Sequence, residues 1–234
     1  MNKKVSIHQP SYFPWLGLLD KIYKSNQFIL LDTVPLNDNA FQSRNIFLNH
    51  RGEVEYLIIP VGKKDYQSKG IKELKIVDKR WQKKHNGFVI ANYKKHPYFD
   101  EVYPMLEVLF SKKYTFLVDA LRDSMEICYS LFDITTEVVL ASELSIDNNL
   151  TKDDLVLAQL KQVKASQYLS GTGAKIYQDE QKFQKENIIL EYQSFAHPQY
   201  QQKNAKKFEL GLSGLDIAFN LGKEGSKNLL KGIV

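Results

Sequence analysis

The start of the chain carries the pattern of a parallel β-α-β unit, and this pattern constrains the fold more than any other feature. Val5 and Ile7 alternate with polar neighbours, which is typical of a short strand. A polar loop follows, and Pro14 stands at a position suited to the first turn of a helix. Apolar side chains then recur at helical spacing up to residue 23. The apolar run 28–31 suits a strand buried in a parallel sheet. Strand, helix and strand within about 30 residues predict a parallel unit.

A hairpin and a helical segment are predicted next. Residues 41–48 and 54–61 flank a short glycine-containing turn, which is typical of a β-hairpin. The stretch 70–133 is rich in aromatic and aliphatic residues at helical spacing, with Pro97 and Pro104 as helix breaks or helix starts. We therefore expect a helical insert between the first unit and the rest of the sheet.

From residue 134 strands and helices alternate again. Strand signals lie at 136–140, 167–170 and 188–192. Thr151 and Asp154 are placed to cap the helix between the first two of them. The predicted fold is α/β, with a mostly parallel sheet, helices on both faces, a β-hairpin after the first β-α-β unit and a helical middle insert. We treat 1–234 as one domain, with a helical subdomain at about 70–133.

Composition narrows the class of protein. The 234 residues include one cysteine, Cys128, so the chain forms no internal disulfide, which fits a reducing compartment. The first residues lack the apolar run of a signal peptide. No window approaches the ~20 apolar residues of a membrane span. We expect a cytoplasmic protein. The net charge of +5 suits an anionic partner, although scattered lysines are also typical of an ordinary solvated surface.

Two polar residues follow the ends of the first two predicted strands. His8 ends the first strand and Asp32 ends the second. Ligands of parallel α/β sheets bind outside the carboxyl ends of the strands, and consecutive parallel strands are usually neighbours. We expect His8 and Asp32 to face one crevice, with His8 as a general acid or base and Asp32 orienting it or holding an amine. Alternatively, His8 caps its loop through a backbone hydrogen bond.

Other candidates for binding are cationic or glycine-rich. Arg44 has the geometry to clamp a carboxylate or phosphate, unless it is a surface arginine of the hairpin. Gly171 and Gly173 stand between a predicted strand and a helix, where backbone amides can approach an anion. Alternatively, glycine is used in this helix entry turn for steric reasons alone. Lys175 and Tyr177 are placed to line the same mouth.

Several kinds of site have no motif in the sequence. There is no paired-cysteine motif and no His-Glu-x-x-His, and the five histidines are widely spaced, so no metal is expected. Cys128 lies among apolar residues at helical spacing and is interpreted as a packing group. The aromatic residues among lysines at 79–85 suit either base stacking or a helix with an aromatic core face and a basic solvent face. Nucleic acid is not the expected partner.

The opening at 7–17, Ile-His-Gln-Pro-Ser-Tyr-Phe-Pro-Trp-Leu-Gly, resembles that of the WbqC-like family. Further similar segments lie, in the same order, at 42–45, 81–85, 92–93, 168–174, 198–201 and 212–220. The resemblance implies a role in O-antigen and related surface polysaccharide synthesis, with transfer of a glycyl or acyl group onto an amino sugar. The family positions that align here are His8, Gln9, Tyr12, Trp15, Arg44, Asn45, Gly171, Gly173, Tyr200, Gln201, Ser213 and Asp216.

A looser resemblance concerns the HIGH-motif superfamily of adenylate-forming and nucleotidyl-transferring proteins. They also have a strand, a proline-containing loop and a helix that begins near a glycine. The places of the two motif histidines correspond here to Trp15 and Leu18, and no Lys-Met-Ser-Lys-Ser stretch follows. This departure argues against ATP-dependent adenylation, while the fold itself does not require those residues.

The sequence thus predicts a transferase that moves an aminoacyl or acyl group to the amine of a nucleotide-linked amino sugar. The sequence does not identify the donor of this group, and a carrier protein is one option. His8 is the expected base, Asp32 holds the amine, and oxyanion donors come from Gln9, Asn45 or the amides of Gly171 and Gly173. Further substrate contacts are expected from Arg44, Lys175, Tyr12, Trp15, Tyr200 and Gln201. The alternatives are a nucleotide-dependent ligase or nucleotidyltransferase, and a non-enzymatic nucleic-acid or assembly partner using basic helices around 72–95.

Overall fold

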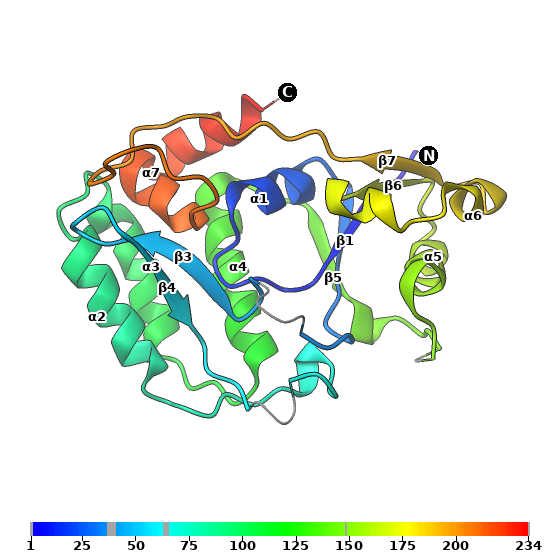
Figure 1. Ribbon diagram of the computed structural model, residues 1–234, viewed down its shortest axis with the longest axis horizontal. Coiled ribbons are helices and arrows are strands. Elements are labelled where there is room, and N and C mark those ends of the chain that lie inside the picture. Colours follow the sequence, from blue (N-terminus) through cyan, green and yellow to red (C-terminus); the bar gives the residue numbers. More distant parts are fainter. Residues whose placement is uncertain (1, 37–40, 63–65, 148, 234) are drawn as a thin grey trace.

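The computed structural model describes residues 2–36, 41–62, 66–147 and 149–233. A five-stranded sheet runs through the molecule in the order β5-β2-β1-β6-β7, and every neighbouring pair is parallel (Figure 1). Its strands are β1 (Lys4–His8), β2 (Gln27–Leu30), β5 (Glu137–Leu140), β6 (Gln167–Ser170) and β7 (Ile189–Tyr192). The predicted parallel sheet and its opening β-α-β unit are confirmed.

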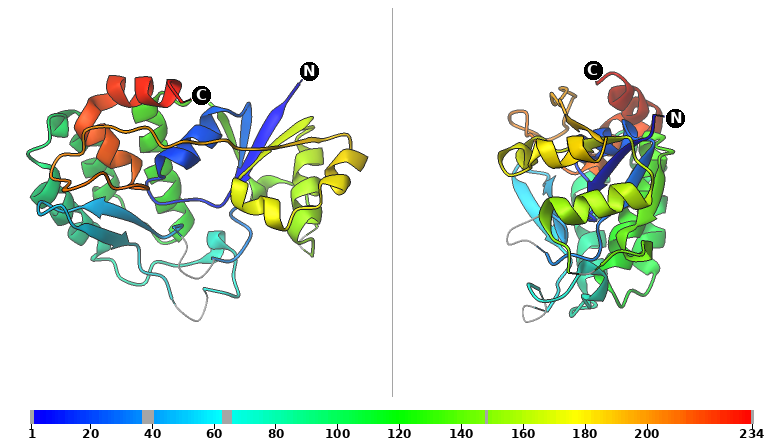
Figure 2. Two further views of the ribbon diagram at one scale, coloured as in Figure 1. Left: turned by 45° about the horizontal axis from the view of Figure 1, so that its top comes forward. Right: turned by 90° about the vertical axis from the view of Figure 1, so that its right-hand side faces the viewer.

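The strand order reverses once, between β1 and β6. Numbered along the chain, the five parallel strands stand in the order 3-2-1-4-5, which is that of a doubly wound sheet. Right-handed crossovers then place α1 (Leu16–Tyr23) on one face and α5 (Lys152–Gln162) and α6 (Glu180–Lys185) on the other. Figure 2 shows α1, in blue, on one side of the strands and α5, in yellow-green, and α6, in gold, on the other.

Alternating residues of the strands feed two hydrophobic clusters. Phe28 and Leu30 pack into the larger cluster, which contains residues of α1 and of the helical insert. Ile29 packs with Val5 and Ile7 into the smaller cluster, beneath α5 and α6. This alternation follows from the two-residue period of a strand, and burial on both faces explains why 28–31 is a continuous apolar run.

The segment between β2 and β5 forms the predicted hairpin and helices. The elements are β3 (Arg44–Leu48), β4 (Val54–Ile58), α2 (Trp81–Tyr93), α3 (Phe99–Ser111) and α4 (Leu117–Phe132). Short 3₁₀ turns also occur in the described part of the chain: η1 (Ile71–Glu73), η2 (Ala141–Glu143) and η3 (Thr172–Ile176). Pro97 precedes α3 as expected, but Pro104 lies inside it. A proline removes one backbone donor and crowds the preceding turn, but the helix continues past Pro104 because the apolar face of α3 stays packed on its neighbours.

The last helix, α7 (Gly214–Lys231), was not predicted from the sequence. Its first turn is capped by Ser213, whose hydroxyl accepts a hydrogen bond from the amide of Leu215. A kink at Gly222, where φ is 70°, interrupts the helical spacing and hides the element in the sequence. Thr151, the expected cap of α5, occupies the N-cap position but makes no side-chain cap hydrogen bond.

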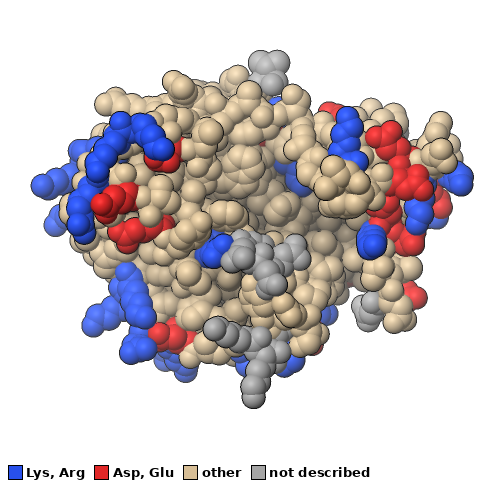
Figure 3. All heavy atoms as spheres, in the orientation of Figure 1, with Lys and Arg blue, Asp and Glu red and all other residues tan. Residues whose placement is uncertain are grey.

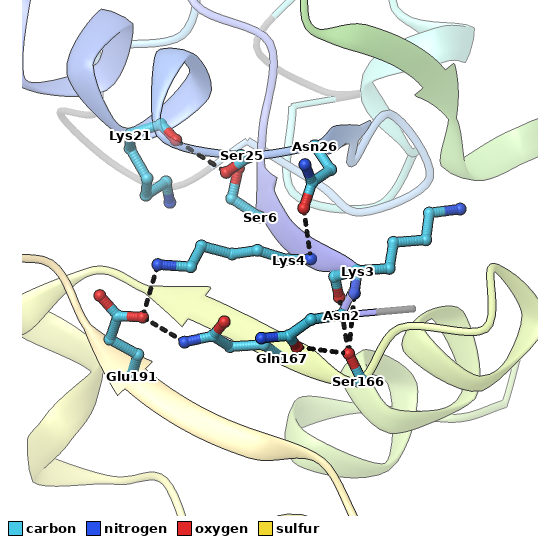
Figure 4. A network of polar contacts seen from close by, with 10 residues as sticks. All are labelled: Asn2, Lys3, Lys4, Ser6, Lys21, Ser25, Asn26, Ser166, Gln167 and Glu191. Atoms are coloured by element: carbon cyan, nitrogen blue, oxygen red, sulfur yellow. Dashed lines mark hydrogen bonds and ion pairs between the residues drawn. The ribbon is translucent and has the colours of Figure 1, made fainter.

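The amino-terminal part of the sheet is joined by a polar network (Figure 4). The amide of Lys4 donates to Asn26 Oδ1 over 2.8 Å, and Lys4 Nζ lies 2.8 Å from Glu191 Oε2. The amide of Lys3 donates to Ser166 Oγ, also over 2.8 Å. These contacts connect β1 with the segments that lead into β2 and β6 and with β7. Polar groups at this end of the strands are thus paired with one another.

Candidate functional site

The loop that follows β1 is held in place by side chains from distant segments. Asn45 Nδ2 donates to the carbonyl oxygens of Tyr12 and Phe13, over 3.1 and 2.6 Å. Ser213 Oγ donates to the carbonyl of Phe13 over 3.0 Å, and the amide of Gly214 donates to that of Pro14 over 2.9 Å. The hairpin and the start of α7 therefore fix the path of this loop, which carries His8 at one end and Trp15 at the other.

His8 has one ring nitrogen engaged. Its Nδ1 lies 2.8 Å from the carbonyl oxygen of Gln9. A carbonyl only accepts hydrogen bonds, so Nδ1 carries the proton and Nε2 has a free lone pair. Burial, together with the charge of Lys21, lowers the pKa of His8 to about 4. The imidazole is therefore neutral near pH 7, with Nε2 as an acceptor. The backbone contact expected of a loop cap and a free Nε2 exist together.

Gln9 and Gln42 join the loops after β1 and β2. Gln9 Nε2 donates to the carbonyl of Pro35 over 2.8 Å, and Gln42 Nε2 donates to Gln9 Oε1. Both ends of the Gln9 amide are thus used within the protein. The backbone carbonyl of Gln9 sets the tautomer of the His8 ring, so Gln9 helps to position His8.

A cavity whose lining includes His8, Lys21 and Gln193, called the polar cavity below, opens at the point where the strand order reverses. Its volume is about 240 Å³. It is lined by His8, Trp15, Gly17, Leu18, Lys21, Gly171, Thr172, Gly173, Gln193 and Phe195. These residues come from the carboxyl ends of β1, β6 and β7 and from α1. Such a switch point is where doubly wound sheets bind their ligands.

A second, more apolar cavity of about 480 Å³ adjoins the first. It is lined by His8, Ser11, Trp15, Leu18, Phe41, Gln42, Asn45, Ile46, Leu210 and Gly211. His8, Trp15 and Leu18 belong to both cavities, so they form the boundary between them. Figure 3 shows a hollow in the middle of this face of the molecule, with most of the charged side chains around its margins.

Trp15 supplies an aromatic wall at that boundary. Its ring meets that of Phe195 edge to face, with centroids 5.3 Å apart. A Cβ at position 17 would lie 2.2 Å from the indole, so only glycine lets the ring lie against α1. The Trp-Leu-Gly end of the opening motif is explained by this contact, and the indole, 38% exposed, offers a flat surface to a bound ring.

Asp32 lies at the carboxyl end of β2 but is bonded elsewhere. Its two carboxylate oxygens accept hydrogen bonds from the amide and the hydroxyl of Ser142, over 2.9 and 2.6 Å. Asp32 is 1% exposed and lines neither cavity. It joins the ends of β2 and β5, and the structure does not bring its carboxylate to the cavities beside His8.

The two predicted phosphate-binding cations lie outside the cavities. The Arg44 guanidinium stacks on the rings of Tyr56 and Phe41, at 4.8 and 5.7 Å from their centroids. Lys175 Nζ lies 5.7 Å from the centroid of the Tyr192 ring. Phe41, one of the two rings under Arg44, lines the apolar cavity. Gly171 and Gly173, in contrast, line the polar cavity as the strand-end argument predicts.

Three other predicted contact residues do not line either cavity. Tyr12 is fully buried, with its hydroxyl 2.8 Å from His85 Nδ1. Tyr200 donates its hydroxyl to Asp216 Oδ2 over 2.8 Å, in a buried cluster where burial raises the pKa of Asp216 to about 6. Gln201 is exposed. Family-motif positions thus include residues that hold the fold as well as residues at the cavities.

Lys21, Gln193 and Phe195 line the polar cavity and were not singled out in the sequence. Gln193 Nε2 donates to Asp20 Oδ2 and to the carbonyl of Gly17, both over 2.8 Å. Lys21 follows Leu18 by three residues, so both lie on one side of α1. That spacing was the available signal, since a lysine among the apolar positions of a helix is unusual.

The structure also bears on the classes of site considered above. Among the described residues, no group of three or more His, Cys, Asp or Glu side chains could hold a metal ion. None of the described helices combines the length and apolar character needed to cross a membrane. Cys128 is buried, and burial raises the pKa of its thiol. Trp81 and Tyr93 are buried too, so these rings face the core rather than a nucleic acid.

The comparisons with known proteins agree over nearly the whole chain. The model of the WbqC-like protein family matches residues 9–228. An uncharacterized protein of Mycobacterium tuberculosis, Rv1507c, is 27% identical over 223 residues, which cover 95% of each chain. No solved structure matches.

Proposed function

This chain belongs to the WbqC-like protein family, and we propose that it transfers an acyl or aminoacyl group, such as glycyl, to the amine of a nucleotide-linked amino sugar in surface polysaccharide synthesis, as for an O-antigen. The observation that carries the proposal is the position of His8. Its free Nε2 belongs to a side chain that borders a polar and an apolar cavity. A base between two cavities suits a reaction that joins two substrates.

In the proposed reaction the sugar amine attacks the carbonyl carbon of the acyl donor. The new N–C bond forms, the bond from that carbon to the donor's leaving group breaks, and His8 Nε2 takes a proton from the amine and returns one to the leaving group. Gln9 and Asn45 use their amide groups to hold the loops. Oxyanion donors are therefore assigned to the backbone at Gly171 and Gly173.

The low pKa of His8 describes the protein without substrate. Burial and the positive charge of Lys21 both disfavour the imidazolium form. An anionic substrate in the polar cavity acts in the opposite direction, since a nearby negative charge stabilises the protonated ring. Substrate binding is thus proposed to raise the pKa of His8 toward the range useful to a base near neutral pH.

The test is an acylation assay. Purified protein is mixed with UDP- and dTDP-linked amino sugars and with acyl or aminoacyl thioesters, and products are followed by mass spectrometry. We expect the mass of one acyl group to be added, and we expect His8→Ala to abolish the addition while keeping the fold. His50→Ala is the matched control, because His50 is exposed on the hairpin turn. Equal turnover by His8→Ala and the wild type would contradict the assignment.

A second candidate is a nucleotide-dependent ligase or nucleotidyltransferase. The observation that favours it is the doubly wound strand order, with a cavity at the switch point, which suits a nucleotide. Trp15 and Leu18, which stand in place of the motif histidines, form an apolar boundary there and do not supply proton donors. ATP-dependent exchange of labelled pyrophosphate would favour this candidate over acyl transfer from a thioester.

A further inference from the structure

Lys21 is a buried cation on a helix that packs against the sheet. Only 4% of the residue is exposed, and burial lowers the pKa of its ammonium to about 8. A lysine at such a position is rare, because removing an ammonium group from water is costly unless a partner compensates. The charge therefore needs an explanation from its surroundings.

The protein compensates that charge only in part. Lys21 Nζ donates one hydrogen bond, over 3.0 Å, to the carbonyl of Ile7. It forms no salt bridge with a carboxylate of the described residues, and its other ammonium hydrogens meet no protein acceptor there. The neighbouring carboxylate of Asp20 is bonded to Lys24 and Gln193 instead. In Figure 4 no contact joins the Lys21 ammonium to the polar network around it.

The space beside Lys21 is kept open by two glycines. Lys21, Gly171 and Gly173 line the same polar cavity. A Cβ built at either glycine would meet no heavy atom within 4 Å, so packing does not require glycine there. Neither glycine has a positive φ, so the backbone conformation does not require it. An absent side chain at both positions instead leaves room for a ligand.

We propose that Lys21 binds a phosphate group of the substrate, with the nucleotide diphosphate of the proposed nucleotide-linked sugar lying in the cavity between β1 and β6. The identity of the ligand rests on the proposed function, whereas the phosphate site rests on the geometry above. A phosphate supplies the missing counter-charge and acceptors for the free ammonium hydrogens. It also places the negative charge near His8, whose pKa Lys21 otherwise lowers.

The test compares Lys21→Met with Lys83→Met, since Lys83 is an exposed lysine of α2 that lines neither cavity. Binding of pyrophosphate, UDP and uridine is measured by calorimetry. We expect Lys21→Met to weaken pyrophosphate and UDP by about tenfold or more, as expected for loss of a charge-assisted contact. Uridine, which has no phosphate, should bind both variants equally, and Lys83→Met should match the wild type throughout.

Two outcomes would overturn the proposal. One is that the wild type binds neither pyrophosphate nor UDP, and the other is that Lys21→Met binds them as the wild type does. If Lys21→Met does not fold, NMR of ¹⁵N-labelled lysine in the wild type replaces it, and an unchanged Lys21 Nζ signal on adding pyrophosphate counts against the site. These readouts require no acyl transfer, so the phosphate site and the proposed reaction can fail separately.

Discussion

At the scale of single residues, the loop that carries His8 depends on a side chain whose amide group is used within the protein. Asn45 binds two successive carbonyl oxygens, those of Tyr12 and Phe13, and its own Oδ1 accepts from the amide of Ile46. All of these groups are buried or nearly so. An unpaired buried carbonyl is costly, so the conformation that presents His8 relies on this amide together with the contacts from Ser213 and Gly214.

Replacing Asn45 tests that dependence. We expect Asn45→Ala to lower the free energy of unfolding by about 1–3 kcal/mol, because the buried carbonyl of Tyr12 loses its donor and that of Phe13 keeps only the hydroxyl of Ser213. Urea denaturation followed by circular dichroism measures the change. Gln201→Ala is the control, since Gln201 is exposed and should change stability by less than about 0.5 kcal/mol. If Asn45→Ala were as stable as this control, the role given to Asn45 would be wrong.

Cys128 gives a second test at this scale. Its side chain is fully buried in α4, and burial raises the pKa of its thiol, so the reactive thiolate is disfavoured. We expect the native protein to resist labelling by a thiol reagent, and the urea-unfolded protein to react with one equivalent. Rapid labelling of the folded chain would show that Cys128 is accessible and would reopen its role.

At the scale of elements, the start of α7 is fitted closely against the opening loop and α1. A Cβ at Gly214 would lie 2.9 Å from the carbonyl oxygen of Pro14 and 2.9 Å from Leu19 Cδ1. Gly87, in the middle of α2, has no heavy atom within 4 Å of the same position. The two glycines therefore differ in what a methyl group would meet, although both lie in helices.

The pair Gly214→Ala and Gly87→Ala separates packing from helix propensity. Gly87→Ala should raise the free energy of unfolding by about 0.5–1 kcal/mol, because alanine restricts the unfolded chain and favours the helix. Gly214→Ala should lower it by about 1–3 kcal/mol, because backbone and a packed leucine must move. Thermal and urea denaturation measure both changes. Equal effects of the two substitutions would mean that α7 does not rest on the loop as described.

How far the sequence predicts the structure also depends on the kind of element. Strand ends are fixed by local patterns, so His8 and Gly171 could be assigned to one edge of the sheet before the fold was known. The engagement of Asp32 with Ser142 could not be predicted, because 110 positions of chain separate them. Lys21 was missed for a related reason. Whether a lysine on a helix is buried depends on what packs over it, and here β6 and the segment after β7 form the cavity.

At the scale of the whole molecule, we expect buried histidines to lower the stability of the fold in acid. Burial lowers the pKa values of His8, His85 and His96 to about 4, each from an ordinary value of 6.5. His85 meets the hydroxyl of Tyr12, while neither ring nitrogen of His96 has a hydrogen-bond partner among the described residues. All three therefore resist protonation in the folded chain more than in the unfolded chain.

The sign of the effect follows from linkage. Between pH 6.5 and 4 the unfolded chain binds more protons at these three histidines, so the free energy of unfolding falls as the pH falls. Asp216 acts oppositely, because its pKa is raised to about 6 and the folded chain takes up that proton first. Three groups outweigh one, and we expect a net loss on the order of a few kcal/mol across this window.

Urea denaturation at several pH values measures this loss of stability, and His96→Phe tests the part that His96 contributes. Because neither nitrogen of His96 is bonded, a phenyl ring can stack on Tyr93 and Phe219 in its place, where the rings now lie 4.6 and 6.3 Å apart, centre to centre. We expect His96→Phe to fold and to lose less stability than the wild type from pH 6.5 to 4. His50→Ala, at an exposed position, is the control and should lose as much stability as the wild type over this pH range. An identical pH dependence in the wild type and His96→Phe would contradict this expectation. It would show that His96 is protonated as readily in the folded chain as in the unfolded one, so that the loss of stability in acid arises from other groups.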